Sequence, residues 1–343
     1  MCGIAGYIGK KEGLPIVLSN LRKLEYRGYD SAGVAYFIKN PNSKIQIPNL
    51  EILKAVGKLE NLEKMIDWVK APPFTAVIGH TRWATHGVPN EVNAHPHLDC
   101  RGEVIVVHNG IIENYRQLKE SLSKKGHRFR SQTDTEVVAH LIEESLKSGR
   151  SFQAAMESSL KEIVGAYAFA IIYKKDPHKI YLARLGSPLV VGVGKDEHYI
   201  ASDPTALAGL VKKVIYLKDG QRGVLSVDGF EIGPARPRIE SLDLTPEQAQ
   251  KGSFPHFMLK EIFEGSEVLT SALRGRLSAK TNSVKLGGLS EVENKLKKIK
   301  KLRSSPAGHL IIPDWSVSYF LKSWRTYPRR FFWLQSTVIA DIQ

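Results

Sequence analysis

The sequence predicts an α+β fold in which two antiparallel sheets are stacked and covered by helices. Apolar segments of strand length follow one another closely, above all over 166–232, so that antiparallel pairing must connect them. Segments with helical periodicity occur in two blocks that separate blocks of strands. Gly3, Gly6 and Gly9 lack the spacing and the preceding strand of a dinucleotide-binding turn. That difference argues against a doubly wound parallel sheet.

The first elements alternate between strand and helix. Residues 2–9 (CGIAGYIG) and 32–38 (AGVAYFI) are short and apolar, which predicts buried strands. Residues 13–28 have apolar side chains near helical spacing, and Gly28 is a plausible end for that helix. Residues 59–70 predict an amphipathic helix, which the following Ala-Pro-Pro would end.

The middle of the chain continues the pattern. Residues 74–80 and 103–110 predict buried strands that run into polar loops. Residues 133–149 predict a helix whose Thr-Asp-Thr-Glu start offers N-cap candidates, and residues 151–165 predict another helix. Closely spaced short strands follow at 166–175, 179–184, 188–194 and 198–202.

Two Asp-Gly pairs within 214–232 have the turn chemistry of β-hairpins. The proline-rich, polar stretch 233–252 then predicts a linker, with a boundary near residue 240. We therefore expect one domain over 2–240, and a linker with a helical lead-in over 241–302.

Composition and cysteine content fit a cytoplasmic protein. The chain has 343 residues, 42% of them apolar, and its only cysteines are Cys2 and Cys100. Two cysteines do not make a disulfide framework, which favours a reducing compartment. No early segment resembles a signal peptide, and no apolar run is long enough to span a bilayer. The sequence thus predicts no membrane partner.

The formal charge of +14 raises the possibility of nucleic-acid binding. The positive charge is concentrated late, since Lys295 to Arg330 include ten basic residues and one acidic residue, Asp314. No zinc-finger, helix-turn-helix or aromatic RNA-binding pattern accompanies it. We therefore expect a solvated basic face and no nucleic-acid partner.

Cys2 follows the initiator methionine directly. A buried cysteine can simply act as a small hydrophobe in a first strand. Removal of Met1, which a small second residue permits, would instead make Cys2 the first residue. Its thiol would then be a nucleophile with the α-amino group, pKa about 8, as a built-in base.

Polar loops at the ends of apolar strands supply the other groups that an attack on a side-chain amide requires. Asn109 and Gly110 offer a side-chain N–H and an unobstructed backbone N–H for an oxyanion hole. Arg82 offers a planar fork for an amino-acid carboxylate. Asp134 offers a carboxylate for the substrate ammonium.

Each of these residues also has an ordinary structural interpretation. Asn109-Gly110 is a common hairpin-turn pair, although the helix-like pattern that begins at IIENY disfavours a hairpin here. Arg82 and Asp134 could be surface charges, and Asp134 could decorate a helix start. Their joint occurrence on strand-end loops favours the catalytic interpretation.

The sequence does not predict a metal centre. Five histidines cluster in the polar stretches, but their spacing matches no standard zinc pattern, even with Cys100 as a further ligand. We expect them to hydrogen-bond neighbouring backbone and to shape a pocket. These five are His80, His86, His95, His97 and His108.

The motifs taken together resemble one enzyme family. CGIAGYIG, EYRGYDSAG, HTRWATHG, NAHPH, HNGIIENY, TDTEV, GSPLVVG, ASD and PHFMLKEI occur in the order found in glutamine–fructose-6-phosphate aminotransferases. These belong to the N-terminal-nucleophile (class II) glutamine amidotransferases. The resemblance covers roughly residues 2–300. The first motif and HNG alone would also fit amidophosphoribosyltransferases.

The resemblance implies a four-layer α/β/β/α sandwich and a glutaminase site without a cofactor. L-glutamine would react at Cys2, giving L-glutamate and ammonia for D-fructose 6-phosphate. Asn109 and Gly110 would form the oxyanion hole. The residues that it implies around the glutamine are Arg82 for the carboxylate, Thr85 and His86 for the pocket, Trp83 for a closing loop and Asp134 for the ammonium.

The end of the chain departs from the family. A phosphate-binding Cys-Gly-Thr-Ser loop should follow KLKKIK, but RSSPAGHLIIPDW stands there instead. We therefore expect 303–343 to be an aberrant tail, as after a frameshift near Leu302, and the fructose-6-phosphate half to be missing. Homodimers in the family form largely through that half, so we do not expect this chain to dimerise in the same way. Two alternatives stay open: an amidophosphoribosyltransferase-like glutaminase, and an inactive amino-acid-binding module.

Overall fold

The computed structural model of this protein describes residues 2–38, 49–68 and 76–244, with Phe254 and a few short segments beyond. The chain divides into two compact units, Met1–Phe257 and Met258–Gln343. The predicted boundaries near residues 240 and 302 stay predictions.

An eight-stranded sheet forms one half of the first unit, with the strand order β14-β11-β9-β10-β1-β4-β2-β3. All of its pairs are antiparallel. Its strands are β1 (Gly3–Gly9), β2 (Ser31–Ile38), β3 (Asn49–Val56), β4 (Ala76–Arg82), β9 (Val190–Val193), β10 (Glu197–Ala201), β11 (Lys213–Tyr216) and β14 (Glu240–Ser241).

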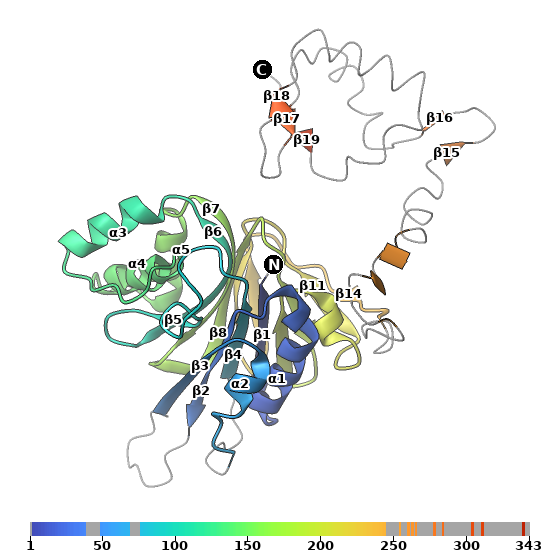
Figure 1. Cartoon of the computed structure of the whole chain (residues 1–343), viewed down its shortest axis with the longest axis horizontal. Helices are drawn as coiled ribbons and strands as arrows, with labels where there is room; N and C mark the ends of the chain where they lie inside the picture. The colour runs from blue at the N-terminus through green and yellow to red at the C-terminus, as the bar shows by residue number, and fades with distance from the viewer. Residues whose placement is uncertain are drawn as a thin grey trace. The chain divides into compact units, whose positions relative to one another are not determined.

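A six-stranded antiparallel sheet forms the other half, with the order β13-β12-β8-β7-β6-β5. Its strands are β5 (His97–Leu98), β6 (Val104–Ile112), β7 (Gly165–Tyr173), β8 (Asp176–Leu185), β12 (Arg222–Leu225) and β13 (Phe230–Gly233). Helices lie on the outer faces of the two sheets (Figure 1). They are α1 (Gly13–Leu24), α2 (Leu59–Glu63), α3 (Tyr115–Lys124), α4 (Glu136–Leu146) and α5 (Phe152–Leu160), with 3₁₀ turns at Glu25–Arg27 and Pro204–Leu207.

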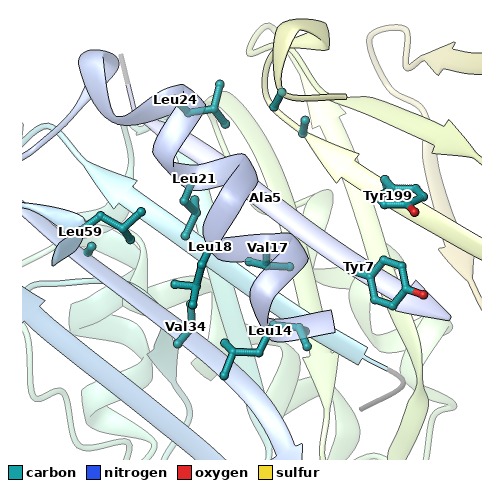
Figure 2. Packing of buried hydrophobic residues seen from close by; sticks show 14 of the residues in the cluster. Ala5, Tyr7, Leu14, Val17, Leu18, Leu21, Leu24, Val34, Leu59 and Tyr199 are labelled. Atoms are coloured by element: carbon teal, nitrogen blue, oxygen red, sulfur yellow. The ribbon is translucent and has the colours of Figure 1, made fainter. Parts of the chain in front are cut away.

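Three layers of buried apolar side chains hold the four layers of backbone together. Alternate residues of β1 point to opposite faces, so Ile4 and Ile8 lie between the sheets while Ala5 and Tyr7 face α1. Figure 2 shows the layer between α1 and the first sheet, where Leu21 projects from the helix. A third cluster packs α4 and α5 against the second sheet. The α+β class and the α/β/β/α sandwich predicted from the sequence are confirmed.

We expect Leu21→Ala to lower the free energy of unfolding by about 2–5 kcal/mol. Leu21 is fully buried between α1 and the sheet, so the shorter side chain would leave a cavity. Urea denaturation measures the change. Ser19→Ala, at an exposed position of the same helix, is the matched control and should change stability by no more than about 0.5 kcal/mol. A loss below about 1 kcal/mol in Leu21→Ala would contradict the described packing.

Several local predictions were incomplete. The strand β3 was not predicted, because 49–56 is mostly half-exposed. The helix-like pattern that begins at IIENY corresponds to α3, whose extent was not predicted because it buries only Leu122. The helix expected over 59–70 ends as α2 at Glu63 and continues in turns to Trp68. The Ala-Pro-Pro stop lies outside the described residues, as does most of the linker and helical lead-in expected over 241–302.

The two Asp-Gly pairs have different roles. Asp228-Gly229 joins β12 to β13 as a hairpin, as predicted. Asp219-Gly220 instead connects β11 of the first sheet to β12 of the second, so the hairpin prediction was wrong there. Asp219 Oδ1 accepts a hydrogen bond from the Gly186 N–H at 2.7 Å, which fixes this crossing.

In the second unit the structure describes two small antiparallel sheets. β15 (Leu277–Ser278) pairs with β16 (Ser283–Val284). β17 (Arg303–Ser304) pairs with β18 (Leu310–Ile311) and β19 (Val338–Ile339). Most of the expected aberrant tail over 303–343 lies outside the described residues, so that expectation stays a prediction. No helix in the described part of the chain is long and apolar enough to cross a membrane.

Candidate active site

Cys2 and Arg82 lie at the ends of the neighbouring strands β1 and β4 of the first sheet, and Asn109 lies within β6 of the second sheet. Cys2 stands directly before β1, and β1 pairs with β4 so that Gly3 lies opposite Thr81. Arg82 is therefore the last residue of the strand beside Cys2. Asn109 lies in β6 of the other sheet and reaches across to Cys2, whose carbonyl oxygen accepts a hydrogen bond from Asn109 Nδ2 at 2.9 Å.

The Cys2 thiol is held against the loop that follows β4. Its Sγ accepts a hydrogen bond from the Trp83 N–H at 3.2 Å and lies 3.5 Å from the Trp83 carbonyl oxygen. Burial raises the pKa of the thiol, while the Trp83 N–H and the charge of Arg82 act to lower it. Because burial has the larger effect, a base is required to produce the thiolate at neutral pH.

The side chain of Asn109 is oriented by His80. The Nε2 atom of His80 lies 3.0 Å from both Asn109 Oδ1 and the His108 carbonyl oxygen. Both partners are acceptors, so Nε2 carries the proton, and the Asn109 NH₂ group must point toward Cys2. One N–H of that group bonds to the Cys2 carbonyl oxygen. The second is not used in any described hydrogen bond.

Gly110 follows Asn109 in β6 with a φ of +133°. A Cβ atom at this position would lie 2.0 Å from the Ala166 carbonyl oxygen. Both facts restrict the position to glycine. The alternative that Asn109-Gly110 forms a hairpin turn was wrong, because both residues pair with β7 inside a nine-residue strand.

Arg82 is 4% exposed, so it is not a surface charge. One guanidinium nitrogen, Nη2, donates hydrogen bonds to the carbonyl oxygens of His86 and Gly87. The other, Nη1, is buried without a hydrogen-bond partner among the described residues. A buried guanidinium N–H without an acceptor is costly, and a bound anion would satisfy it.

Asp134 is likewise 4% exposed, so the surface-charge alternative was wrong here too. Its Oδ2 accepts a hydrogen bond from the Ile112 N–H at 2.7 Å, and its Oδ1 lies 3.9 Å from His86 Nδ1. It does not cap α4, whose N-cap residue, Thr135, makes no side-chain cap bond either. The Thr135 hydroxyl instead contacts His108 Nδ1 at 2.9 Å, which corrects the predicted cap.

The remaining predicted residues lie in the loop after β4. Trp83 is 46% exposed, and its ring packs edge-on against Tyr29 at 5.7 Å. The ring of His86 packs against Tyr115 at 5.3 Å. Thr85 is exposed, and no described interaction connects it to the other predicted residues.

Sequence reasoning missed one group that shapes this loop. Asp30 Oδ2 accepts a hydrogen bond from the Ala84 N–H at 2.8 Å, and the Asp30 N–H donates to the Arg82 carbonyl oxygen at 3.0 Å. Asp30 lies in EYRGYDSAG, a motif that carried the family resemblance but no predicted role. His80 was predicted only as a pocket-shaping histidine, without its contact to Asn109.

Four of the predicted pocket histidines are buried: His80, His95, His97 and His108. Burial lowers the pKa of His80 to about 3 and lowers those of the other three as well. They hydrogen-bond one another and nearby groups: His95 Nδ1 accepts the His108 N–H at 3.3 Å, and His97 Nε2 contacts Thr133 Oγ1 at 3.0 Å. Neutral, buried rings of this kind resist protonation only while the protein is folded.

We expect stability to fall as the pH is lowered from 7 toward 5. Unfolded histidines take up protons near pH 6.5, whereas the buried ones do not, so acid favours the unfolded chain. At pH 5 each histidine whose folded pKa lies well below 5 would cost about 2 kcal/mol. Urea denaturation at several pH values measures the slope. The carboxylates whose pKa is lowered to about 2, Glu136 and Glu144, lose their contribution only below this window.

A histidine variant isolates this effect. His95→Gln removes one buried titrating ring and should make the slope of stability against pH shallower. His178→Gln, at an exposed position, should leave the slope unchanged. Stability that stays constant between pH 7 and 5 would contradict a role for the buried histidines.

Comparisons with known proteins find relatives of this chain among glutamine amidotransferases. A family model described as a glutamine amidotransferase domain matches residues 80–209, which include His80, Arg82, Asn109 and Asp134. Among solved structures, the glutamine phosphoribosylpyrophosphate amidotransferase from B. subtilis has a TM-score of 0.56 and 27% identity, covering 68% of this chain and 49% of its own. A structure titled the allosteric regulatory enzyme of purine biosynthesis has a TM-score of 0.57 at 27% identity, with 68% and 48% covered.

Relatives with higher identity carry another name. The glutamine–fructose-6-phosphate aminotransferase (isomerizing) of Pyrococcus horikoshii is 44% identical over 283 residues, covering 81% of this chain and 46% of the relative. That of Thermus thermophilus is 45% identical over 293 residues, covering 84% and 46%. The chain spans about half the length of the curated relatives it matches.

Two stacked antiparallel sheets, together with the match to an amidotransferase domain and the similar solved structures, define a class II glutamine amidotransferase of the N-terminal-nucleophile type. Within that class, the relatives at 40–46% identity share one description. The chain belongs to the family of glutamine–fructose-6-phosphate aminotransferases.

Proposed function

We propose that this chain cleaves the side-chain amide of L-glutamine at Cys2 and releases L-glutamate and ammonia. The observation that carries the proposal is the contact between the two sheets where β1 and β4 face β6. There Asn109, fixed by His80, donates to Cys2 while Arg82 Nη1 lies buried without a partner. A nucleophile, an oriented N–H donor and an anion-seeking guanidinium thus lie at one end of the sandwich.

The proposed reaction begins with removal of Met1. The α-amino group of Cys2 then takes the thiol proton, and the thiolate sulfur forms a bond to the amide carbon of glutamine. The second N–H of Asn109 and the backbone N–H of Gly110 would donate to the oxyanion. The amine returns the proton to the leaving nitrogen, ammonia departs, and water cleaves the thioester to give glutamate.

The proposed substrate contacts use the two buried charges. The carboxylate of glutamine would bind Arg82 Nη1, and its ammonium would bind Asp134 Oδ1, since Oδ2 is already occupied by the Ile112 N–H. Burial lowers the pKa of Arg82, while the nearby charges of Cys2, Asp30 and Asp134 act to raise it. We assign Trp83, Thr85 and His86 to the rim of the pocket.

We propose D-fructose 6-phosphate as the acceptor of the ammonia in the complete reaction. The names of relatives at 40–46% identity support this acceptor. The likeness to phosphoribosylpyrophosphate amidotransferases, at 27% identity, is weaker support for the alternative acceptor. This chain would supply the deamidation half in the cytoplasm, without a cofactor.

An assay of glutamate release tests the proposal. The mass of the intact protein should correspond to a chain that begins at Cys2, and glutamine should give equal amounts of glutamate and ammonia. Asparagine, one methylene shorter, is the control substrate and should react far more slowly. Glutamine that binds without being cleaved by a chain beginning at Cys2 would contradict the proposal and favour the inactive binding module.

A further inference from the structure

A second group of chemically reactive side chains lies away from Cys2. Four atoms converge within 4.8 Å of one another: Cys100 Sγ, His127 Nδ1, His140 Nδ1 and a carboxylate oxygen of Glu143. Cys100 stands in the turn between β5 and β6, His127 follows α3, and the other two residues lie one turn apart on α4. The side chains of His127, His140 and Glu143 are 0%, 1% and 7% exposed.

The distances between these atoms are those of a small tetrahedron. Cys100 Sγ lies 3.7 Å from His127 Nδ1 and 3.5 Å from His140 Nδ1. The two Nδ1 atoms are 3.2 Å apart, and Glu143 Oε2 lies 3.0 and 3.4 Å from them. Tetrahedral zinc, with bonds of about 2.05 Å to nitrogen or oxygen and about 2.3 Å to sulfur, requires edges of about 3.3 and about 3.6 Å.

The outer atoms of both histidines fit the same interpretation. His127 Nε2 lies 3.0 Å from Glu144 Oε2, which also accepts a hydrogen bond from Lys147 Nζ. His140 Nε2 lies 3.5 Å from Glu136 Oε1 and is buried without a hydrogen bond among the described residues. His127 Nε2 also lies 3.2 Å from Lys147 Nζ. With the proton on Nε2 of each ring, His127 would donate to Glu144 and both Nδ1 lone pairs would be directed at the centre.

Backbone N–H groups donate to the other two proposed ligand atoms. The Arg128 N–H donates to Cys100 Sγ at 3.3 Å, and the Cys100 N–H donates to Glu143 Oε2 at 3.1 Å. Such N–H donors stabilise a thiolate and a carboxylate. A thiolate, a carboxylate and two neutral imidazoles around a divalent ion would have no net charge, which suits a site with three buried ligands and an exposed Cys100.

We propose that Cys100, His127, His140 and Glu143 bind one Zn²⁺ ion in a closed tetrahedral site. All four ligands come from the protein, so the site is structural and leaves no position for a substrate. It would tie the loop after α3 and the β5–β6 turn to α4. The sequence prediction of no metal centre considered other histidines, and this inference is independent of the proposed function.

Metal analysis and cobalt substitution test the site. The purified protein should contain about one zinc per chain, and removal of zinc by a chelator should lower its melting temperature. Zinc-free protein given Co²⁺ should show the strong visible bands of tetrahedral cobalt, with a thiolate charge-transfer band. Cys100→Ser should lose that charge-transfer band, and His140→Gln should lose most of the zinc. His178→Gln, an exposed histidine, is the matched control and should retain both.

The outcomes separate a zinc site from a purely hydrogen-bonded cluster. Wild-type protein that gives no tetrahedral cobalt spectrum would overturn the proposal. So would a Cys100→Ser variant that gives the same spectrum as wild type, or a chelator that leaves the melting temperature unchanged. The cobalt measurement on wild-type protein does not depend on whether any variant folds.

Discussion

Cys2→Ala should abolish glutamate release, with a loss of about 10⁴-fold or more. The variant lacks the sulfur to which the Trp83 N–H donates, while the bond from Asn109 to the Cys2 carbonyl oxygen can persist. Glutamine binding should change little, because Arg82 and Asp134 are untouched. Glutamate release under saturating substrate and glutamine binding by calorimetry measure the two effects. Equal rates in Cys2→Ala and wild type would contradict the nucleophile assignment.

A blocked terminus gives a sharper control. A protein with an N-terminal extension keeps the thiol but converts the α-amino group to an amide, which cannot act as a base. This form should be inactive, and site-specific cleavage that leaves Cys2 first should restore activity. Full activity before cleavage would show that another group removes the thiol proton.

Asn109→Ala should lower kcat by about 10²–10³-fold and change KM much less. Its amide is expected to donate to the oxyanion only as the tetrahedral intermediate forms, so its loss affects the transition state more than the bound substrate. Steady-state glutaminase kinetics measure both constants. Asn61→Ala, at an exposed position on the far side of the first sheet, is the matched control and should leave kcat unchanged. A large rise in KM with unchanged kcat would place Asn109 in substrate binding instead.

The fold was largely predictable because strands buried on both faces have continuous apolar sequences. The strand β1, with all seven residues buried, illustrates this signal. Elements with one exposed face were harder to predict: α3 buries only Leu122, and β3 buries only Ala55. The crossing at Asp219-Gly220 could not be predicted, because the same dipeptide suits a hairpin and a connection between sheets.

The site was predictable as a set of residues but not as a geometry. The motifs and their chemistry predicted Cys2, Arg82, Asn109 and Asp134. In the structure Cys2 and Arg82 lie at strand ends, Asn109 lies within β6, and Asp134 accepts a hydrogen bond from Ile112, the last residue of β6. The orienting bond from His80 to Asn109 joins two sheets, so no local spacing reveals it. The sequence did not predict the candidate zinc cluster for the same reason, because only two of its four residues, His140 and Glu143, share a helix.

The bonds of Arg82 have a consequence for how the pocket opens. The Arg82 guanidinium donates hydrogen bonds from Nη2 to the carbonyl oxygens of His86 and Gly87. Its other nitrogen, Nη1, is buried without a hydrogen-bond partner among the described residues. A bound carboxylate would pair with the same Arg82 cation that hydrogen-bonds the loop at the rim of the pocket. Occupancy and rim shape are therefore coupled through one side chain, and lysine, with a single nitrogen, could not perform both tasks at once.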